Sequence, residues 1–180
     1  MDSSHTKLKP GISVVVPVYR SGECLPALIE ALGAVLPTLA DSYECILVND
    51  GSPDNSRAVM HELSVEHAWI RPVNLLRNYG QHNALLCGIR QARYEILVTM
   101  DDDLQNPPEE VHRLWEYTRD NDYDVVYAQY RQKMHPRWRN LGSKFTNWCV
   151  EKTQGKPKGL YLVSFRCMAR LVVESILSYQ

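Results

Sequence analysis

Three consecutive carboxylates, Asp101, Asp102 and Asp103, directly follow the apolar run 96–100 of this 180-residue chain. Adjacent ionised carboxylates repel one another, so their proximity costs stability unless a positive charge lies among them. Asp and Gln oxygens suit a hard divalent cation such as Mg²⁺ or Mn²⁺, which proteins commonly share with substrate phosphates. The run therefore predicts a metal-assisted site for a phosphorylated substrate. A second interpretation is a solvated acidic turn that caps the helix starting near Pro108, because Asp is common at helix N-termini.

The direction of each acidic side chain can be predicted if the segment is extended. Alternate residues of an extended segment point to the same side. We therefore expect Asp101, Asp103 and Gln105 to face a metal and a diphosphate, and Asp102 to face the other way.

Polar residues also follow the three earlier apolar runs of the chain. Tyr19 follows the run 12–18, Asp50 follows 43–48, and Arg77 follows 70–76. Ligands of parallel α/β sheets bind at the carboxyl ends of the strands, so these residues and the acidic run predict one shared site. Tyr19 either stacks on a nucleobase or is an ordinary tyrosine. Asp50 either accepts a hydrogen bond from a base or forms an Asx turn with a helix cap.

The segment from Arg77 to His82 has its own chemistry. Arg77 offers a positive charge to a phosphate, and Gly80 lets the following helix start close to a ligand. We expect His82 to cap that helix rather than to bind a ligand. No G-x-G-x-x-G or Walker sequence occurs in the chain, which disfavours dinucleotide-type and P-loop binding.

Strand and helix patterns alternate along the chain, which predicts parallel βαβ units in a three-layer α/β/α sandwich with a mostly parallel sheet. The length suits one domain, residues 11–180, after a flexible N-terminus of residues 1–10. The predicted strands are 12–18, 43–48, 70–76, 95–100 and 124–130. The predicted helices are 23–35, 53–66, 81–92, 109–119, 138–152 and 167–178.

Composition and charge exclude several classes of protein. The net charge of −1 shows no general bias toward nucleic acid. The five cysteines are scattered without C-x-x-C spacing, which argues against a zinc site or a disulfide framework and fits a reducing cytoplasm. The first ten residues lack the apolar core of a signal peptide, and no stretch approaches the ~20 apolar residues of a membrane helix.

One part of the chain is strongly basic. Residues 131–150 contain five bases and no acid, together with Trp138, Phe145 and Trp148. Basic residues mixed with aromatic ones suit lipid headgroups or a phosphate. The alternative is a solvated helix face with its aromatic residues in the core.

Four ordered blocks carry a family resemblance that covers roughly residues 10–130. They closely resemble the family 2 glycosyltransferases of the nucleotide-diphospho-sugar transferase (GT-A) fold, and within that family the polyprenyl-phosphate sugar transferases. Ser164-Phe165-Arg166 is similar to a further block of that family. The four blocks are VVVPVY (14–19), VNDGSPDNS (48–56), RNYGQHNA (77–84) and MDDDLQNPPEE (100–110).

The resemblance implies a role for each matching residue. The nucleotide would be bound by Pro17, Tyr19, Glu23, Asp50, Arg77 and Asp102. The Mg²⁺ or Mn²⁺ ion would be bound by Asp101, Asp103 and Gln105. The catalytic residues would be Asp101, Asp103 and Arg131, of which Arg131 would hold the acceptor phosphate, while Arg166 would either assist it or be structural.

The resemblance also implies an inverting reaction. A lipid phosphate oxygen attacks the anomeric carbon of the sugar, and the nucleoside diphosphate leaves. An ionised phosphate needs little or no general base, so the metal stabilises the leaving diphosphate. The implied donor is a nucleotide-diphospho-sugar, with UDP favoured and GDP open. The implied acceptor is a polyprenyl phosphate used in cell-envelope glycan synthesis, at the cytoplasmic face of the inner membrane, and a homo-oligomer is compatible with this.

The chain departs from the family pattern at several positions. Arg20-Ser21 stand where the family usually has Asn-Glu, Gln129-Tyr130-Arg131 where it has Gly-Ser-Arg, and no acid occurs at 160–164. Relatives continue into interfacial or membrane helices, whereas this sequence ends at Gln180. The alternative function is therefore a non-catalytic nucleotide-sugar-binding or scaffold domain. A phosphohydrolase or receiver domain is disfavoured, because its acidic cluster would follow the first strand.

Overall fold

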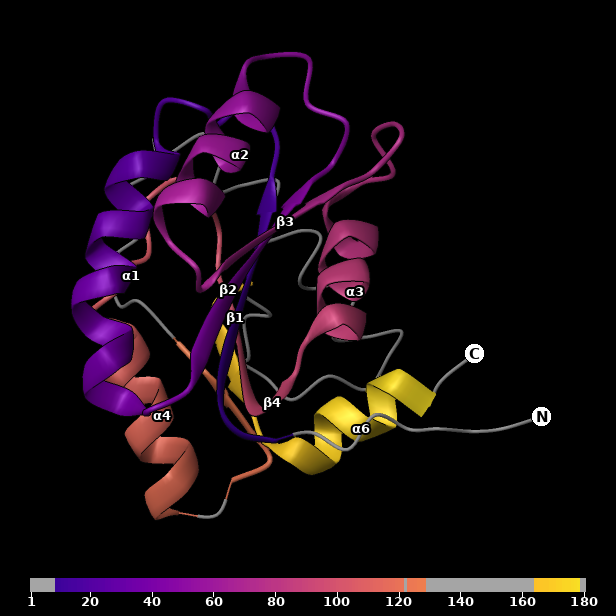
Figure 1. Cartoon of the computed structure of the whole chain (residues 1–180). Coiled ribbons are helices and arrows are strands. Elements are labelled where there is room, and N and C mark those ends of the chain that lie inside the picture. Colours follow the sequence, from indigo (N-terminus) through magenta and orange to yellow (C-terminus); the bar gives the residue numbers. More distant parts are fainter. Residues whose placement is uncertain (1–8, 122, 129–163, 179–180) are drawn as a thin grey trace, which may run out of the picture. The chain divides into compact units, whose positions relative to one another are not determined.

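The computed structural model describes residues 9–121, 123–128 and 164–178 (Figure 1). The chain divides into one compact unit of residues 1–126 with 164–180 and a second of residues 127–163. The strands are β1 (Lys9–Val18), β2 (Tyr43–Asn49), β3 (Ile70–Asn74), β4 (Tyr94–Thr99), β5 (Val125–Tyr127) and β6 (Arg166–Met168). The helices are α1 (Leu25–Leu39), α2 (Ser56–Glu66), α3 (Gln81–Gln91), α4 (Glu110–Asp120) and α6 (Arg170–Ser178).

The strands form one sheet in the order β3-β2-β1-β4-β6-β5. β1 is parallel to both β2 and β4, and β2 is parallel to β3. β6 is antiparallel to β4, with Leu97 opposite Met168. The prediction of a mostly parallel sheet is therefore confirmed.

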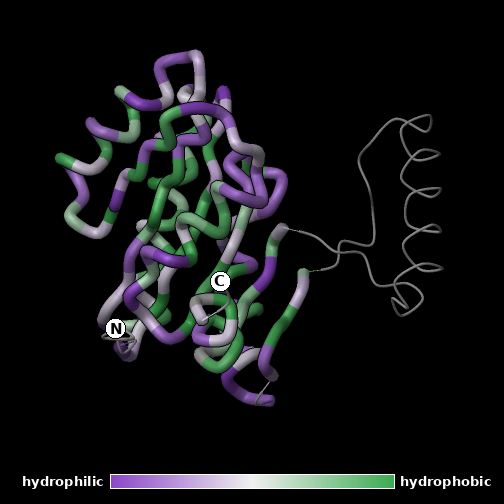
Figure 2. Tube along the Cα trace, turned by 90° about the vertical axis from the view of Figure 1, so that its right-hand side faces the viewer, coloured by the Kyte–Doolittle hydropathy of each residue, from purple (hydrophilic) through white to green (hydrophobic). Residues whose placement is uncertain are grey.

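Helices cover both faces of the sheet, as predicted for a three-layer sandwich. Figure 1 shows α1, α2 and α4 on one face and α3 with α6 on the other. Because both faces are covered, residues 12–18 of β1 are all buried, and all of them except Ser13 are apolar, so the strand does not alternate between apolar and polar residues. Figure 2 shows the hydrophobic residues concentrated along the inner strands.

The largest difference from the predicted elements lies near the C-terminal end of the described chain. The apolar pattern from Cys167 to Ser178 predicted one helix, but Cys167 and Met168 belong to β6 and α6 begins at Arg170. Both residues are buried beside β4. A short buried strand and a buried helical turn have the same apolar composition, so the sequence pattern does not distinguish them. Pairing with β4 makes these residues a strand.

Smaller differences concern the ends of elements. β1 begins at Lys9 instead of residue 12, and β3 ends at Asn74 rather than at residue 76. α1 continues to Leu39 with Pro37 in its last turn, because Leu36 and Leu39 extend its buried stripe. The predicted helix 138–152 lies outside the described residues. Within the described ranges, no helix is both long and apolar enough to cross a membrane.

The contact between α3 and the sheet is so close that it permits no side chain at Gly88. A Cβ atom there would lie 2.4 Å from Val15 Cγ1 and 3.0 Å from Val48 Cγ2. We expect Gly88→Ala to lower the free energy of unfolding by about 2 kcal/mol through overpacking, although helix propensity alone favours alanine by roughly 1 kcal/mol. Urea denaturation measures the change. Gly33→Ala in α1 is the matched control, because its nearest neighbour would be Trp69 at 3.5 Å. Equal effects at both glycines would contradict the packing argument.

Candidate functional site

A cavity of about 390 Å³ lies at the carboxyl ends of β1, β2 and β4. The sheet and the loops that follow it therefore bring together the polar strand ends singled out in the sequence. The lining residues are Pro17, Val18, Tyr19, Asp50, Asn78, Gly80, Gln81, Asp101, Asp102 and Asp103.

The cavity opens where the ladder between β1 and β4 ends. The backbone N–H of Met100 donates to the carbonyl of Val15 at 3.2 Å, and β4 ends at Thr99. Pro17 lies two residues beyond Val15, so its backbone nitrogen is directed toward the same side of β1 as that of Val15, the side of β4. Because proline has no N–H, it leaves no unpaired donor on this open side.

Asp101 is held by hydrogen bonds on both carboxylate oxygens. Gln81 Nε2 donates to Oδ1 at 2.6 Å, and the Ser164 hydroxyl donates to Oδ2. The carbonyl of Ser164 in turn accepts a hydrogen bond from the Thr99 hydroxyl. Gln81 at the start of α3 and Ser164 before β6 therefore set the direction of Asp101. Both residues stood in blocks noted in the sequence, but their pairing with Asp101 could not be read there.

The segment 101–106, here called the acidic loop, is not extended, so the prediction of alternating side-chain directions is wrong. Leu104 has a φ of +57°, and residues 102–106 are bent. Asp102 consequently lines the same cavity as Asp101 and Asp103. Gln105 is not among the described lining residues, and its backbone N–H donates to Asp103 Oδ1 at 3.1 Å.

Asp102 faces the loop that follows β1. Its Oδ2 accepts a hydrogen bond from the Tyr19 backbone N–H at 3.2 Å. Burial raises the pKa of Asp102, and the charge of Asp103 acts in the same direction, whereas bonds from Ser21 and the Tyr19 N–H oppose the rise. Burial thus disfavours the ionised form relative to a carboxyl in water, and a nearby cation would act in the opposite direction.

Asp50 lines the cavity and does not form the Asx turn that was one of its two interpretations. It is buried, and its two oxygens accept the N–H groups of Tyr79 at 2.7 Å and Gly80 at 2.9 Å. The turn after β2 is bonded by Asn49 instead, whose Oδ1 accepts the Ser52 N–H at 2.9 Å. Asp50 therefore holds the loop that leads into α3.

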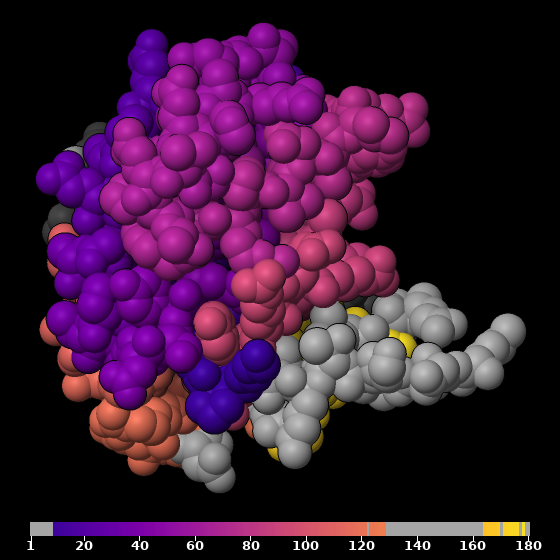
Figure 3. All heavy atoms as spheres, viewed as in Figure 1, coloured from indigo at the N-terminus to yellow at the C-terminus, as the bar shows by residue number. Residues whose placement is uncertain are grey.

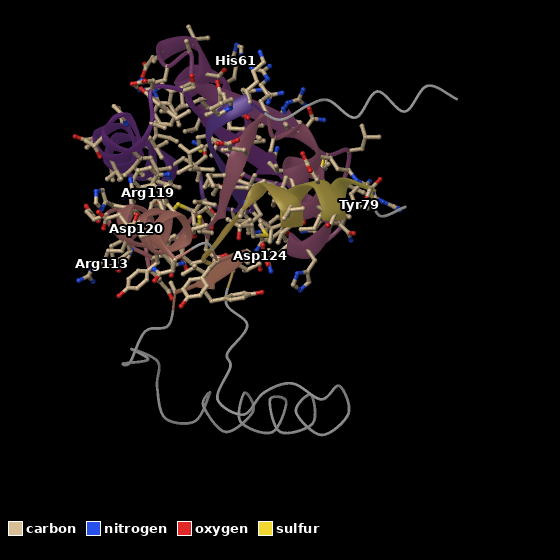
Figure 4. All side chains as sticks on the ribbon, turned by 90° about the horizontal axis from the view of Figure 1, so that it is seen from below. His61, Tyr79, Arg113, Arg119, Asp120 and Asp124 are labelled. Carbon is tan, nitrogen blue, oxygen red and sulfur yellow. The ribbon has the colours of Figure 1, made fainter. Side chains whose placement is uncertain are left out.

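Other predicted residues lie at the rim or away from the cavity. Tyr19 is 43% exposed and lines it, whereas Glu23 and Arg77 are exposed and are not among its described lining residues. The Arg77 guanidinium lies 4.9 Å from the centre of the Tyr79 ring. Figure 4 shows Tyr79 on the α3 side of the sheet, opposite Arg113 and Arg119 of α4. In the space-filling view the segment between β3 and α3 projects from the surface (Figure 3).

Two further sequence assignments concern the start of α3 and the arginines. The N-cap of α3 is Gly80, with a φ of +90°, so His82 is not the cap that was predicted. Arg166 lies opposite Thr99 in the sheet, and its buried Nε has no hydrogen-bond partner among the described residues. Arg131 lies outside the described residues.

The donor set fits a divalent cation that is shared with a substrate. Among the residues described here, no three His, Cys, Asp or Glu side chains form a ready metal site. Mg²⁺ commonly takes one or two carboxylates and completes its shell with water and substrate phosphates, so such a cluster is not required. Four carboxylates line the cavity (Asp50, Asp101, Asp102 and Asp103), and no lysine or arginine is among its described lining residues. This lining repels a bare anion and attracts a cation.

Comparison with known proteins gives a family match over most of the chain. The family model described as "Glycosyl transferase family 2" matches residues 13–172.

Curated relatives are bacterial lipid-phosphate sugar transferases. The chain is 39% identical over 167 residues to the undecaprenyl-phosphate 4-deoxy-4-formamido-L-arabinose transferase of Proteus mirabilis (strain HI4320), covering 92% of this chain and 51% of the relative. It is 39% identical over 176 residues to the transferase of that name from Yersinia enterocolitica serotype O:8 / biotype 1B, covering 97% of this chain and 53% of the relative. The chain thus spans about half the length of these relatives.

Solved structures with a similar fold are nucleotide-sugar transferases. The mannosyltransferase PcManGT from Pyrobaculum calidifontis, in complex with GDP-Man and Mn²⁺, aligns with a TM-score of 0.67 and 17% identity over 97% of this chain and 50% of its own. Glucosyl-3-phosphoglycerate synthase from Mycobacterium tuberculosis, in complex with Mn²⁺, UDP and phosphoglyceric acid, aligns with a TM-score of 0.71 and 19% identity over 91% of this chain and 57% of its own. The predicted nucleotide-diphospho-sugar transferase (GT-A) fold is thereby confirmed.

Proposed function

The chain belongs to glycosyl transferase family 2, and from this premise we propose that it moves a sugar from a nucleotide-diphospho-sugar to a polyprenyl phosphate. The observation that carries the proposal is the acidic cavity at the carboxyl ends of β1, β2 and β4. Its surplus of carboxylates suits a complex of a divalent cation with a nucleoside diphosphate, whose negative charge the cation offsets.

The substrate classes in this proposal come from the relatives. The names of the curated relatives specify undecaprenyl phosphate and an arabinose-type sugar, and the chain shares 39% identity with them. A polyprenyl phosphate is therefore the acceptor we propose, at the cytoplasmic face of the membrane and in cell-envelope glycan synthesis. We favour a UDP-sugar donor, because the blocks at 77–84 and 100–110 resemble those of bacterial UDP-sugar enzymes.

The proposed reaction requires little from the side chains as acids or bases. An oxygen of the acceptor phosphate forms a bond to the anomeric carbon, and the bond from that carbon to the diphosphate breaks. The bonding electrons leave with the nucleoside diphosphate, and an acceptor that is already ionised has no proton to lose. Asp101 and Asp103 would hold Mg²⁺ or Mn²⁺, which when bound stabilises the charge of the leaving diphosphate. The first turn of α3, beside Gly80 and Gln81, would offer backbone N–H groups to the phosphates.

Metal-dependent nucleotide binding tests the proposal directly. We expect one of UDP, GDP, CDP and ADP to raise the melting temperature of the chain with Mn²⁺ present, and EDTA to remove the shift. A ligand at 100 times its Kd stabilises the folded state by about 2.7 kcal/mol, which a thermal-shift assay detects. Asp103→Ala should weaken this binding about tenfold or more, because it removes a carboxylate ligand of the cation.

The control for Asp103→Ala is Glu62→Ala, which removes an exposed acid of α2 away from the cavity. It should leave the shift unchanged. The absence of a shift with all four nucleotides would refute a competent donor site. If the donor binds but is never hydrolysed or transferred, the chain is instead a non-catalytic nucleotide-sugar-binding domain.

A further inference from the structure

The loop between β1 and α1 is held through four successive backbone N–H groups. Each of them donates to a side chain from another segment of the chain, and we call residues 19–22 the β1 loop. The bonds are Tyr19 to Asp102 Oδ2 (3.2 Å), Arg20 to Ser52 Oγ (2.7 Å), Ser21 to Ser56 Oγ (3.2 Å) and Gly22 to Asp54 Oδ2 (3.3 Å). Arg20 has a φ of +59°, which is uncommon for a residue other than glycine. These side-chain acceptors therefore impose the bend of the loop.

Three of the four acceptors belong to one internally bonded segment. Asp54 Oδ1 accepts the hydroxyls of Ser52 at 2.5 Å and Ser56 at 2.6 Å. These bonds tie the β1 loop to the beginning of α2, on the side away from the acidic loop. The fourth acceptor, Asp102, links the β1 loop to the acidic loop.

The bond between Tyr19 and Asp102 lies beyond the last backbone hydrogen bond between β1 and β4. The ladder of β1 and β4 ends at the bond from Met100 to Val15, and Pro17 has no N–H to extend it. Both Tyr19 and Asp102 line the cavity that opens beyond this point. This bond therefore joins the backbone of Tyr19 to the segment that carries Asp101 and Asp103.

We propose that Asp102 is a positioning residue, which holds the backbone of Tyr19 in place and neither ligates the cation nor contacts the nucleotide. The inference rests on the donor site proposed above and replaces the nucleotide-binding role that the family resemblance implies for Asp102. Its consequence is that the acidic loop and the tyrosine at the cavity wall are joined, so that a bound cation and an aligned nucleotide reinforce each other.

Two substitutions separate positioning from ligation. In Asp102→Ala the Tyr19 N–H loses its acceptor, whereas in Asp102→Asn the amide Oδ1 still accepts it. In the ligand-free chain we expect amide hydrogen exchange at Tyr19, followed by NMR, to accelerate about fivefold in Asp102→Ala and to return to the original rate in Asp102→Asn. The amides of Arg20, Ser21 and Gly22 serve as internal controls, because their acceptors remain. An unchanged Tyr19 rate in Asp102→Ala would overturn the proposal.

Binding of Mn²⁺ without nucleotide, measured by water-proton relaxation, provides the second readout. We expect the Mn²⁺ affinity of Asp102→Ala to stay within about twofold of the original, whereas Asp103→Ala loses it. With Mn²⁺ present, nucleotide affinity should fall about fivefold in Asp102→Ala and recover in Asp102→Asn. A loss of Mn²⁺ affinity in both Asp102 variants would make Asp102 a metal ligand and end the proposal. If the unmodified chain binds no nucleotide, the proposed function fails, while the exchange rates and the Mn²⁺ affinities still decide the role of Asp102.

Discussion

Replacing Gly51 with alanine is expected to lower the free energy of unfolding by about 3 kcal/mol and to abolish metal-dependent nucleotide binding. Gly51 has a φ of +62°, and a Cβ atom there would lie 2.4 Å from the carbonyl carbon of Arg77 and 2.5 Å from the Asn78 nitrogen. These are backbone atoms, so they cannot rotate away as a flexible side chain would. The displaced backbone leads directly to Tyr79 and Gly80, which Asp50 holds, and Asn78 and Gly80 line the cavity.

A second substitution at the same position separates backbone strain from the steric contact. Asparagine adopts a positive φ more readily than alanine, so Gly51→Asn would recover stability if strain were the whole cause. We expect no recovery, because the Cβ contact remains. Denaturation in urea with linear extrapolation compares the two variants. A denaturation midpoint of Gly51→Ala equal to that of the unmodified chain would contradict the argument.

Replacing Glu44 with alanine should also lower the free energy of unfolding by about 3 kcal/mol, through a different mechanism. The Glu44 side chain is only 3% exposed. Its oxygens accept hydrogen bonds from the Ser13 hydroxyl (2.8 Å), Arg71 Nη1 (2.8 Å) and the Arg93 backbone N–H (2.7 Å). Removing the carboxylate takes away the acceptor that these three donors share. The Arg71 side chain, which is only 24% exposed, also loses its ion-pair partner.

Glu44 lies near the amino end of β2, so its replacement should change stability without changing nucleotide affinity. The cavity lies at the opposite ends of the strands, so nucleotide affinity should be unchanged at temperatures where the variant is folded. Replacing both members of the pair, as Glu44→Leu with Arg71→Met, should recover part of the stability, because Arg71 is no longer left unpaired, whereas the Ser13 hydroxyl and the Arg93 N–H still lack their acceptor. Glu30→Ala, at an exposed position of α1, is the neutral control. A double variant as unstable as Glu44→Ala would show that the unpaired Arg71 is not a cause of the destabilisation.

Several features of the protein could be predicted from the sequence because their causes are local or periodic. The spacing of Leu25, Leu28, Ile29 and Leu32 specifies a helix with one buried face, and the run 12–18 specifies a strand buried on both sides. The alternation of such elements permits few arrangements other than a parallel sheet between two helical layers. In that arrangement the carboxyl ends of the strands meet, so the gathering of Tyr19, Asp50 and the acidic run followed from topology alone.

Tertiary structure alone decided what each gathered side chain contacts. Asp102 lies in a bent segment and accepts the N–H of Tyr19, 83 residues earlier. The two partners of Asp101 lie 20 residues earlier at Gln81 and 63 residues later at Ser164. The residues of β6 look helical in sequence and became a strand because an unpaired edge of β4 was available. The sequence by itself thus determined which elements form and that their polar ends share one site. Which carboxylate faces a ligand and which holds a loop depended on contacts between residues distant in the chain, because no local pattern records them.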